Sequence, residues 1–245
     1  MNVNNTQHKK QFQAILFDLD DTLCNTSQTK KSVFSKVYDN NGSLKQATKN
    51  EFIKVALSER DRYINEAKGH QTYARIEMWE RIFKKLKLTL STREMKMLID
   101  MYWKYSSEEL TLFPNAKEVL EKIFNTEIIT AVFAGGDFYS KASKLVKLNI
   151  DMYFNYVFTS DLIKLPKNDP KIYKWVARFI KCKPENILVV GNNPILDIEP
   201  ANKAGMQTAQ SMMYKKSVVP GRGDKRPNFI IYKLTGLLEL LQINN

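Results

Sequence analysis

The sequence predicts an α/β fold, a doubly wound and mostly parallel sheet, with an all-helical segment inserted after the first strand. From Phe113 onward, short apolar runs typical of strands alternate with stretches of helical periodicity. This alternation indicates a parallel sheet covered on both faces. Between about residues 30 and 110 only helical periodicity is present. We therefore expect no strand in that part of the chain.

The first expected strand, 14–17, ends in the acidic heptapeptide Phe-Asp-Leu-Asp-Asp-Thr-Leu, residues 17–23. Residues two apart along a strand point to the same side, so we expect Asp18 and Asp20 to face one site. One carboxylate able to attack and one able to carry a proton suit covalent catalysis. A polar turn after an edge strand is the alternative interpretation.

Three amphipathic patterns follow the first strand. The first contains Phe52, Val55, Ala56 and Glu59–Arg60; the second Ile76, Trp79, Ile82, Phe83 and Leu86; the third Met95, Leu98, Ile99, Tyr102 and Trp103. Ser91 and Thr92 are typical start signals for the third helix, and all three spacings are helical. We expect residues 24–110 to form a helical cap domain and residues 1–23 and 111–245 to form an α/β core domain.

The rest of the chain predicts alternating elements. Helices are expected at 115–124, 139–148, 170–181, 194–204 and 234–242, and strands at 127–133, 156–158, 187–190, 207–211 and 229–232. In such folds ligands bind at the carboxyl ends of the strands, near the switch in strand order. Asp18 lies at such an end, and we expect three later segments of the chain to lie beside it.

Those segments are Ala134-Gly135 after the strand 127–133, Lys167 before the helix 170–181, and 191–197 after the strand 187–190. Together with the acidic heptapeptide, and in this order, they resemble the motifs of the haloacid dehalogenase superfamily. The helical segment stands where that family carries its cap. The resemblance spans residues 14–212 and implies a Rossmann-like core.

The resemblance implies an Mg²⁺-dependent phosphatase that acts through an aspartyl-phosphate. By this resemblance Asp18 is the nucleophile and a metal ligand, and Asp20 is the general acid and base, with its backbone carbonyl on the metal. Thr22 binds near the phosphate, Lys167 balances the phosphate charge, and Asp197 holds the metal. The implied substrate is a small phosphorylated metabolite.

Two positions depart from the family pattern. Asn192 stands where the first metal-binding acid is usual; its amide oxygen can still ligate Mg²⁺ but brings no charge. Ala134 replaces a phosphate-binding Ser or Thr, leaving backbone N–H groups at Gly135 and Gly136 as donors. These departures keep open a weakened, non-catalytic member that binds a phosphorylated ligand or a protein. A sugar phosphomutase also stays open, whereas Asp20 disfavours a dehalogenase.

Four residues between the first two cap helices are candidates for substrate specificity, because caps of this kind carry recognition residues in the family. They are Lys68, His70, Tyr73 and Arg75. Solvated positions on a helix surface are the alternative interpretation. The sequence indicates neither the identity of the substrate nor the oligomeric state.

Composition and charge limit the cellular location and the partners that we expect. The chain is 43% hydrophobic, enough for a sizeable core, and Cys24 and Cys182 lie without metal-ligand spacing. With no apolar stretch of membrane-spanning length and no signal peptide at the start, we expect a cytoplasmic protein that binds no membrane. The net charge of +12 divides evenly between residues 24–110 and the rest. We therefore expect no nucleic-acid partner, but a basic surface able to attract an anionic substrate.

Overall fold

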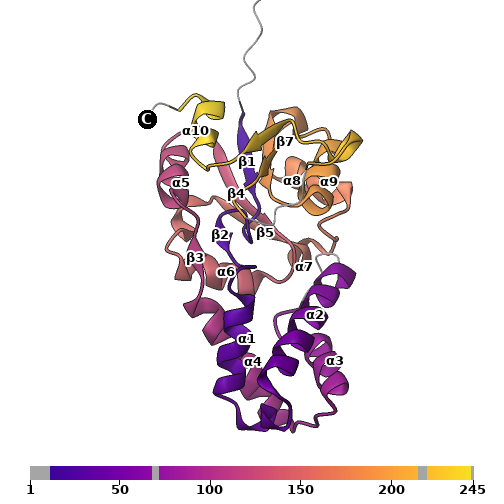
Figure 1. The fold of residues 1–245 in the computed structure, drawn as a ribbon. Helices are drawn as coiled ribbons and strands as arrows, with labels where there is room; N and C mark the ends of the chain where they lie inside the picture. The colour runs from indigo at the N-terminus through magenta and orange to yellow at the C-terminus, as the bar shows by residue number, and fades with distance from the viewer. Residues whose placement is uncertain (1–11, 68–71, 215–219, 244–245) are drawn as a thin grey trace, which may run out of the picture.

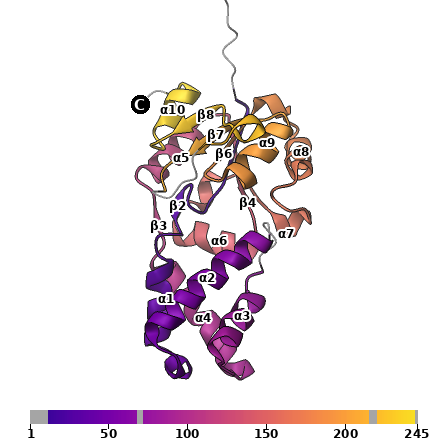
Figure 2. The same cartoon turned by 45° about the vertical axis from the view of Figure 1, so that its right-hand side comes forward.

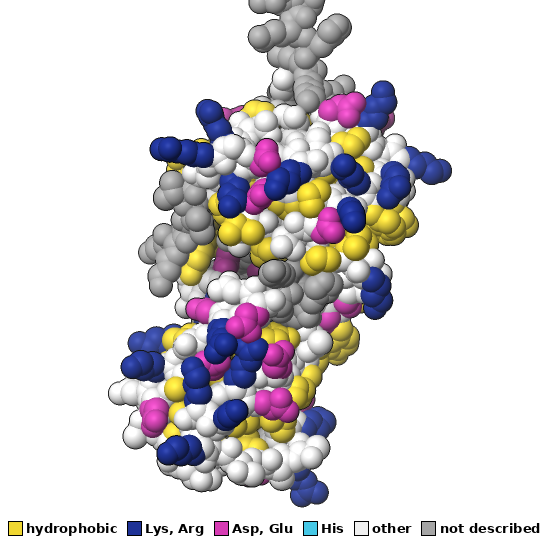
Figure 3. All heavy atoms as spheres, turned by 90° about the vertical axis from the view of Figure 1, so that its right-hand side faces the viewer, with side chains coloured by type: hydrophobic (Ala, Val, Ile, Leu, Met, Phe, Trp, Pro, Cys, Tyr) yellow, Lys and Arg dark blue, Asp and Glu magenta, His cyan; other side chains and the backbone are white. Residues whose placement is uncertain are grey.

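The computed structural model describes residues 12–67, 72–214 and 220–243. The described residues form two bodies, a sheet covered by helices and a separate group of helices (Figure 1). The face in Figure 3 intersperses acidic and basic side chains over both bodies. In the described ranges, every helix is too short or too polar to cross a membrane.

The larger body is built on a six-stranded sheet in the order β5-β4-β1-β6-β7-β8, and each neighbouring pair is parallel. Its strands are β1 (Ala14–Phe17), β4 (Ile129–Ala134), β5 (Tyr156–Thr159), β6 (Ile187–Gly191), β7 (Gln207–Ser211) and β8 (Phe229–Ile231). Because β1 pairs with both β4 and β6, the acidic residues that follow β1 emerge at the centre of the sheet.

Helices cover both faces of this sheet (Figures 1 and 2). One layer holds α5 (Ala116–Phe124), α6 (Phe138–Lys147) and α10 (Gly236–Leu241), and the other holds α8 (Pro170–Phe179) and α9 (Glu199–Lys203). Alternate strand residues enter the two apolar clusters: Ile15 and Phe17 pack with the first layer, Ala14 and Leu16 with the second. This period of two is what a sheet buried on both sides requires.

The smaller body contains α1 (Lys30–Asp39), α2 (Lys49–Ala67), α3 (Ile76–Leu86) and α4 (Thr92–Glu108). Its core is a separate apolar cluster centred on Phe34, whose ring lies 6.0 Å from that of Trp79 and 6.1 Å from that of Phe52. Two short antiparallel strands, β2 (Cys24–Asn25) and β3 (Thr111–Leu112), pair where the chain enters and leaves this body. They hold its two connections side by side.

The structure confirms the expected doubly wound α/β core with parallel strands. Four details differ from the expectation. The helix α1 precedes the three amphipathic helices that were expected in the smaller body. The strands β2 and β3 were not expected, because two-residue strands carry no readable periodicity. The short helix α7 (Ser160–Ile163) was likewise not expected. The single helix expected at 194–204 divides into a π-helical turn, Pro194–Ile198, and α9. The division into domains at residues 24 and 110 stays a prediction.

Candidate active site

The loop that follows β1 places Asp18 at the carboxyl end of the central strand. The Asp18 N–H donates to the Val190 carbonyl at 2.8 Å, so the strand pairing continues up to this residue. The chain then turns back at once, because the N–H groups of Leu23 and Cys24 both donate to the Leu19 carbonyl. Asp21 adopts a left-handed conformation with φ of 61° within the turn. This tight turn keeps Asp18 and Asp20 at one edge of the sheet.

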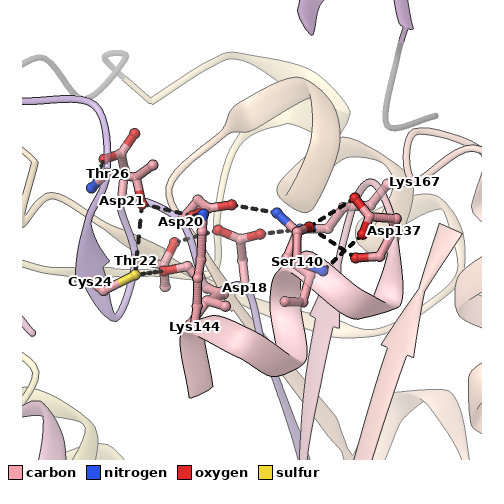
Figure 4. Close-up of polar contacts among 12 residues, drawn as sticks. Asp18, Asp20, Asp21, Thr22, Cys24, Thr26, Asp137, Ser140, Lys144 and Lys167 are labelled. Carbon is pink, nitrogen blue, oxygen red and sulfur yellow. Dashed lines mark hydrogen bonds and ion pairs between the residues drawn. The ribbon is translucent and has the colours of Figure 1, made fainter. Parts of the chain in front are cut away.

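The Asp18 carboxylate is held from two sides. The Thr22 hydroxyl donates to its Oδ2 at 2.9 Å, and the Lys167 ammonium donates to its Oδ1 at 2.5 Å (Figure 4). Lys167 lies in the loop before α8, so residues 149 positions apart meet here. These two contacts fix the orientation of the Asp18 carboxylate.

Lys167 is a buried cation between two carboxylates. Its side chain is 3% exposed, and its Nζ lies 2.5 Å from Oδ1 of Asp18 and 2.5 Å from Oδ1 of Asp197. Burial alone would lower the pKa of Lys167, but Asp18 and Asp197 together raise it above the ordinary value. The lysine is therefore charged throughout the physiological range.

Asp197 lies in the π-helical turn after β6, with only 1% of its side chain exposed. Its Oδ2 accepts from the Asn193 N–H at 2.8 Å. Burial, followed by the nearby Asp18 charge, raises the pKa of Asp197 to about 6 despite Lys167. Gly191 makes room for this carboxylate, because a Cβ there would lie 2.4 Å from the Asp197 Cγ.

Asp20 is held by different partners from those of Asp18. Lys141 and Lys144 of α6 both form ion pairs with it, and the Thr26 hydroxyl donates to its Oδ1 at 2.7 Å (Figure 4). Burial raises the pKa of Asp20, but the two lysines outweigh it and hold that pKa well below its usual range. In this arrangement Asp20 is a carboxylate, ready to accept a proton rather than to donate one.

The residues after β4 also reach this site. Ala134 ends β4 and is 1% exposed, and Gly135 lines the same cavity as Asp18. Gly136 has φ of 91°, a conformation that favours glycine. Asp137 then caps α6 by accepting from the Ser140 N–H at 2.8 Å. This turn starts the helix that carries Lys141 and Lys144 to Asp20.

A cavity of about 500 Å³ unites these groups and lies between the two bodies. The larger body contributes Asp18, Asp20, Asp21, Gly135, Lys141, Lys144, Lys167, Asn192, Asn193, Leu196, Asp197 and Tyr214, and the smaller body and its connector contribute Thr26, Ser27, Lys30, Arg60, Asp61, Ile64, Asn65 and Arg75. Two of the predicted residues do not line the cavity, but Thr22 donates to the lining residue Asp18, and Ala134 precedes the lining residue Gly135. The structure thus brings the predicted core residues together.

The four cap candidates have different outcomes. Lys68 and His70 lie outside the described residues. Arg75 lines the cavity. Tyr73 instead stacks on Trp103, with ring centroids 4.9 Å apart, and borders a neighbouring cavity of about 300 Å³. Tyr73 is therefore less suited to contact a ligand bound at Asp18.

Several residues at this site were missed by the sequence reasoning. Lys141 and Lys144 follow the glycine turn one helical turn apart, a spacing that puts both on one face. Arg60 falls within the amphipathic pattern of its helix, so a charge on an apolar face was the available signal. Lys30 and Asp21 gave no such signal.

The oxygen donors at the strand ends suit a hard cation. In the described part of the chain, no three or more Asp, Glu, His or Cys side chains are grouped as a metal site on their own. Asp18 and Asp197 would have to be joined by the Asn192 amide and a backbone carbonyl, which are donors that Mg²⁺ accepts. Two buried carboxylates facing one lysine also leave negative charge for a cation to offset. The donor set is therefore compatible with Mg²⁺.

Known proteins resemble this chain over most of its length. The sequence pattern described as haloacid dehalogenase-like hydrolase matches residues 15–210. A glyceraldehyde 3-phosphate phosphatase from Pyrococcus furiosus is 24% identical over 236 residues, which are 96% of this chain and 95% of the relative.

Solved structures share the fold. A HAD phosphatase from Thermococcus onnurineus has a TM-score of 0.64 at 22% identity, covering 95% of this chain and 99% of its own. The L-2-haloacid dehalogenase from Xanthobacter autotrophicus has a TM-score of 0.69 at 16% identity, with coverage of 95% and 99%. Because enzymes of both activities share this fold, the reaction has to be argued from the site residues.

Proposed function

This chain belongs to the haloacid dehalogenase-like hydrolases, and we propose that it uses Mg²⁺ and an aspartyl-phosphate to hydrolyse a small phosphomonoester. Four of its relatives are named glyceraldehyde 3-phosphate phosphatases. Phosphoric monoester hydrolase is accordingly its enzyme class. The metal, the intermediate and the substrate are the proposed parts.

The observation that carries the proposal is the buried Lys167 shared between Asp18 and Asp197. An attacking carboxylate must be ionised, yet it repels the phosphate it attacks. A fixed cation beside Asp18 offsets that repulsion, because it attracts the phosphoryl oxygens. The Thr22 hydroxyl keeps the other Asp18 oxygen in place.

The proposed reaction has two steps. In the first, Asp18 forms a bond to phosphorus, the bond from phosphorus to the substrate oxygen breaks, and Asp20 gives that oxygen a proton. In the second, water attacks the aspartyl-phosphate, Asp20 takes a proton from the water, and the bond to Asp18 breaks. Inorganic phosphate leaves and both carboxyl groups return to their starting state.

Asp20 must therefore gain a proton before the first step. Lys141 and Lys144 favour its ionised form, which suits the second step. Negative charge brought by a bound phosphate raises the pKa of a nearby carboxyl group. We infer that the substrate itself promotes protonation of Asp20 by competing for the two lysines.

Mg²⁺ would be held by Asp18, Asp197, the Asn192 amide and the backbone carbonyl of Asp20. When bound, it would offset negative charge on the phosphoryl oxygens. The helical segment, residues 24–110, would act as a cap that covers the cavity and excludes water during the first step. Backbone N–H groups near Gly135 would replace the hydroxyl that Ala134 lacks.

The test is hydrolysis of p-nitrophenyl phosphate with and without Mg²⁺, comparing the wild type with Asp18→Asn. Asp100→Asn is the matched control, because it makes the same change in an exposed ion pair of α4. Turnover that requires Mg²⁺ and persists only in the control supports the proposal. If wild type is inert across a broad panel of phosphoesters, Ala134 and Asn192 become the explanation, and a phosphate-binding protein is the better description.

A further inference from the structure

A smaller cavity of about 30 Å³ adjoins the cap side of the active-site cavity. Five residues line both spaces: Thr26, Lys30, Arg60, Arg75 and Lys144. Tyr102 and Trp103 of α4 line the smaller cavity but not the larger one. A group that extends from Asp18 toward the cap would therefore meet the shared residues first.

The lining of this smaller cavity has one sign of charge. Four of its residues are cationic, and none of the described residues that line it is acidic. Lys144 is already paired with Asp20. Arg60 and Lys30 pair with Asp61 at 2.9 Å and 3.7 Å, but the Asp61 side chain is 62% exposed and so screened by water.

Arg60 and Arg75 present unused hydrogen-bond donors. Arg60 comes from α2 and only 6% of its side chain is exposed, yet its Nε is buried without a partner among the described residues. The Arg75 Nε is in the same situation, while its Nη1 donates to the Tyr102 hydroxyl at 2.8 Å. Buried donors of a charged group without an acceptor are costly, so a bound group that accepts from them is stabilised.

The surrounding packing holds these cations in place. The Arg75 guanidinium lies 4.9 Å from the Trp103 ring centroid and 5.6 Å from that of Tyr102. Burial and then repulsion by Arg60 lower the pKa of Lys30 to about 8. The cluster is thus fixed in position and short of negative charge, which is the character of a preformed anion site.

We propose that Lys30, Arg60 and Arg75 bind a second anionic group, a carboxylate or a phosphate, of the substrate whose phosphomonoester binds at Asp18. This proposal rests on the proposed function. It narrows the substrate to small phosphomonoesters with two anionic ends. Arginine suits this role because its planar donors match both oxyanions.

The test measures binding in the Asp18→Asn background, where no turnover occurs, by calorimetry with two matched pairs of probes. 3-Phosphoglycerate is compared with glycerol 3-phosphate for a carboxylate, and fructose 1,6-bisphosphate with fructose 6-phosphate for a second phosphate. We expect the two-anion member of at least one pair to bind at least about tenfold more tightly. Whichever pair shows this preference identifies the second anion.

Arg60→Met should reduce that preference to about twofold or less, and Arg60→Lys should restore part of it. Arg62→Met is the matched control, since Arg62 lies on the same helix but is exposed and paired with Glu66; it should keep the full preference. If Arg60→Met does not fold, Lys30→Met gives the same test with a side chain that is 16% exposed.

The outcomes separate this inference from the proposed function. Equal affinity within both pairs overturns the second-anion site, whether or not p-nitrophenyl phosphate is hydrolysed. A preference that survives both Arg60→Met and Lys30→Met overturns the assignment to these residues. A preference lost in those variants, in a protein without phosphatase activity, supports the site and overturns the proposed function alone.

Discussion

The two ends of the active-site cavity differ in whether their charged side chains have partners. At the core end, cations are matched by carboxylates: Lys167 lies between Asp18 and Asp197, and two lysines of α6 hold Asp20. At the cap end, Arg60 and Arg75 keep buried donors without acceptors in the described chain. The side chains at the core end are held by partners within the protein, as chemistry on a fixed scaffold requires. The cap end, in our proposal, is completed by the ligand.

The two ends also differ in the secondary structure that positions their side chains. Core side chains follow strands whose register is fixed by pairing on both sides. Cap side chains project from helices with their own apolar core, joined to the sheet through β2 and β3. A constant reactive end and a separately supported recognition end allow one to change without the other.

The largest expected effect comes from removing the buried cation at the core end. Lys167→Met leaves Asp18 and Asp197 buried without their shared cation. Removing one partner of a buried ion pair costs about 3–5 kcal/mol, and we expect kcat/KM to fall by at least about 100-fold. Urea denaturation and steady-state kinetics measure the two effects.

Lys171→Met is the control for this change, because Lys171 lies four residues away on the exposed surface of α8. Added Mg²⁺ should restore part of the lost stability in Lys167→Met by offsetting the two carboxylates. A Lys167→Met protein with unchanged kcat/KM would contradict the role of this residue at the reactive end.

A smaller effect follows from crowding Asp197. Gly191→Ala places a Cβ 2.4 Å from the Asp197 Cγ, so the carboxylate must move. Overpacking of this kind costs about 1–3 kcal/mol, and the displaced ligand should weaken Mg²⁺ binding. Thermal unfolding with and without Mg²⁺ measures both. Gly42→Ala, where a Cβ meets nothing within 4 Å, should change neither. A Gly191→Ala protein with full Mg²⁺ stabilisation would contradict Asp197 as a metal ligand.

The same contrast explains what could be predicted from sequence. The parallel sheet and the meeting of Asp18 with the segment that carries Asp197 follow from apolar strands and the polar residues that end them, because parallel strands place those ends together. Lys167 ends no strand, and it was predicted only through the resemblance to the family motif. The pairing of Asp20 with Lys141 and Lys144 could not be predicted. It depends on the direction of α6 and on contacts across more than 120 positions.

The cap end was still harder to predict. Arg75 was among the candidates, but Arg60 was assigned to an amphipathic pattern and Lys30 gave no signal. Helical periodicity tells which face is buried, not which helices meet. Only the packing of α1, α2 and α4 brings Lys30, Arg60 and Tyr102 to one cavity.

Removing one lysine partner of Asp20 should change how the stability of the protein depends on pH. The pKa of Asp20 lies well below its usual value because of Lys141 and Lys144. The stability this gives is present above the unfolded pKa and is lost as pH falls through the folded one. Lys144→Met raises the folded pKa of Asp20, so less of that stability remains, with a loss of about 1–3 kcal/mol at neutral pH. Thermal unfolding between pH 3 and about 7 tests this.

Lys147→Met is the matched control, since Lys147 is an exposed residue near the end of the same helix. It removes the same charge without touching Asp20. Identical pH profiles for Lys144→Met and Lys147→Met would show that Lys144 does not govern the ionisation of Asp20.

The smallest expected effect is a change in the protonation of Lys30 at the cap end. Lys30 has a pKa of about 8 in the fold, below its ordinary 10.5, because of burial and Arg60. Between these values the unfolded chain binds more protons, so stability rises with pH across that window. A bound anion raises the pKa of Lys30, and binding near pH 8.5 should then take up about half a proton.

Calorimetry in two buffers of different ionisation enthalpy measures this uptake, with 3-phosphoglycerate and the Asp18→Asn protein. The phosphate bound at Asp18 can take up protons as well, so the decisive quantity is the difference from Asp18→Asn/Lys30→Met. We expect that difference to be positive near pH 8.5 and to vanish near pH 6.5, where Lys30 is fully protonated before binding. An equal uptake in both proteins at pH 8.5 would mean that the second anion does not reach Lys30. The second-anion site would then consist of Arg60 and Arg75 alone.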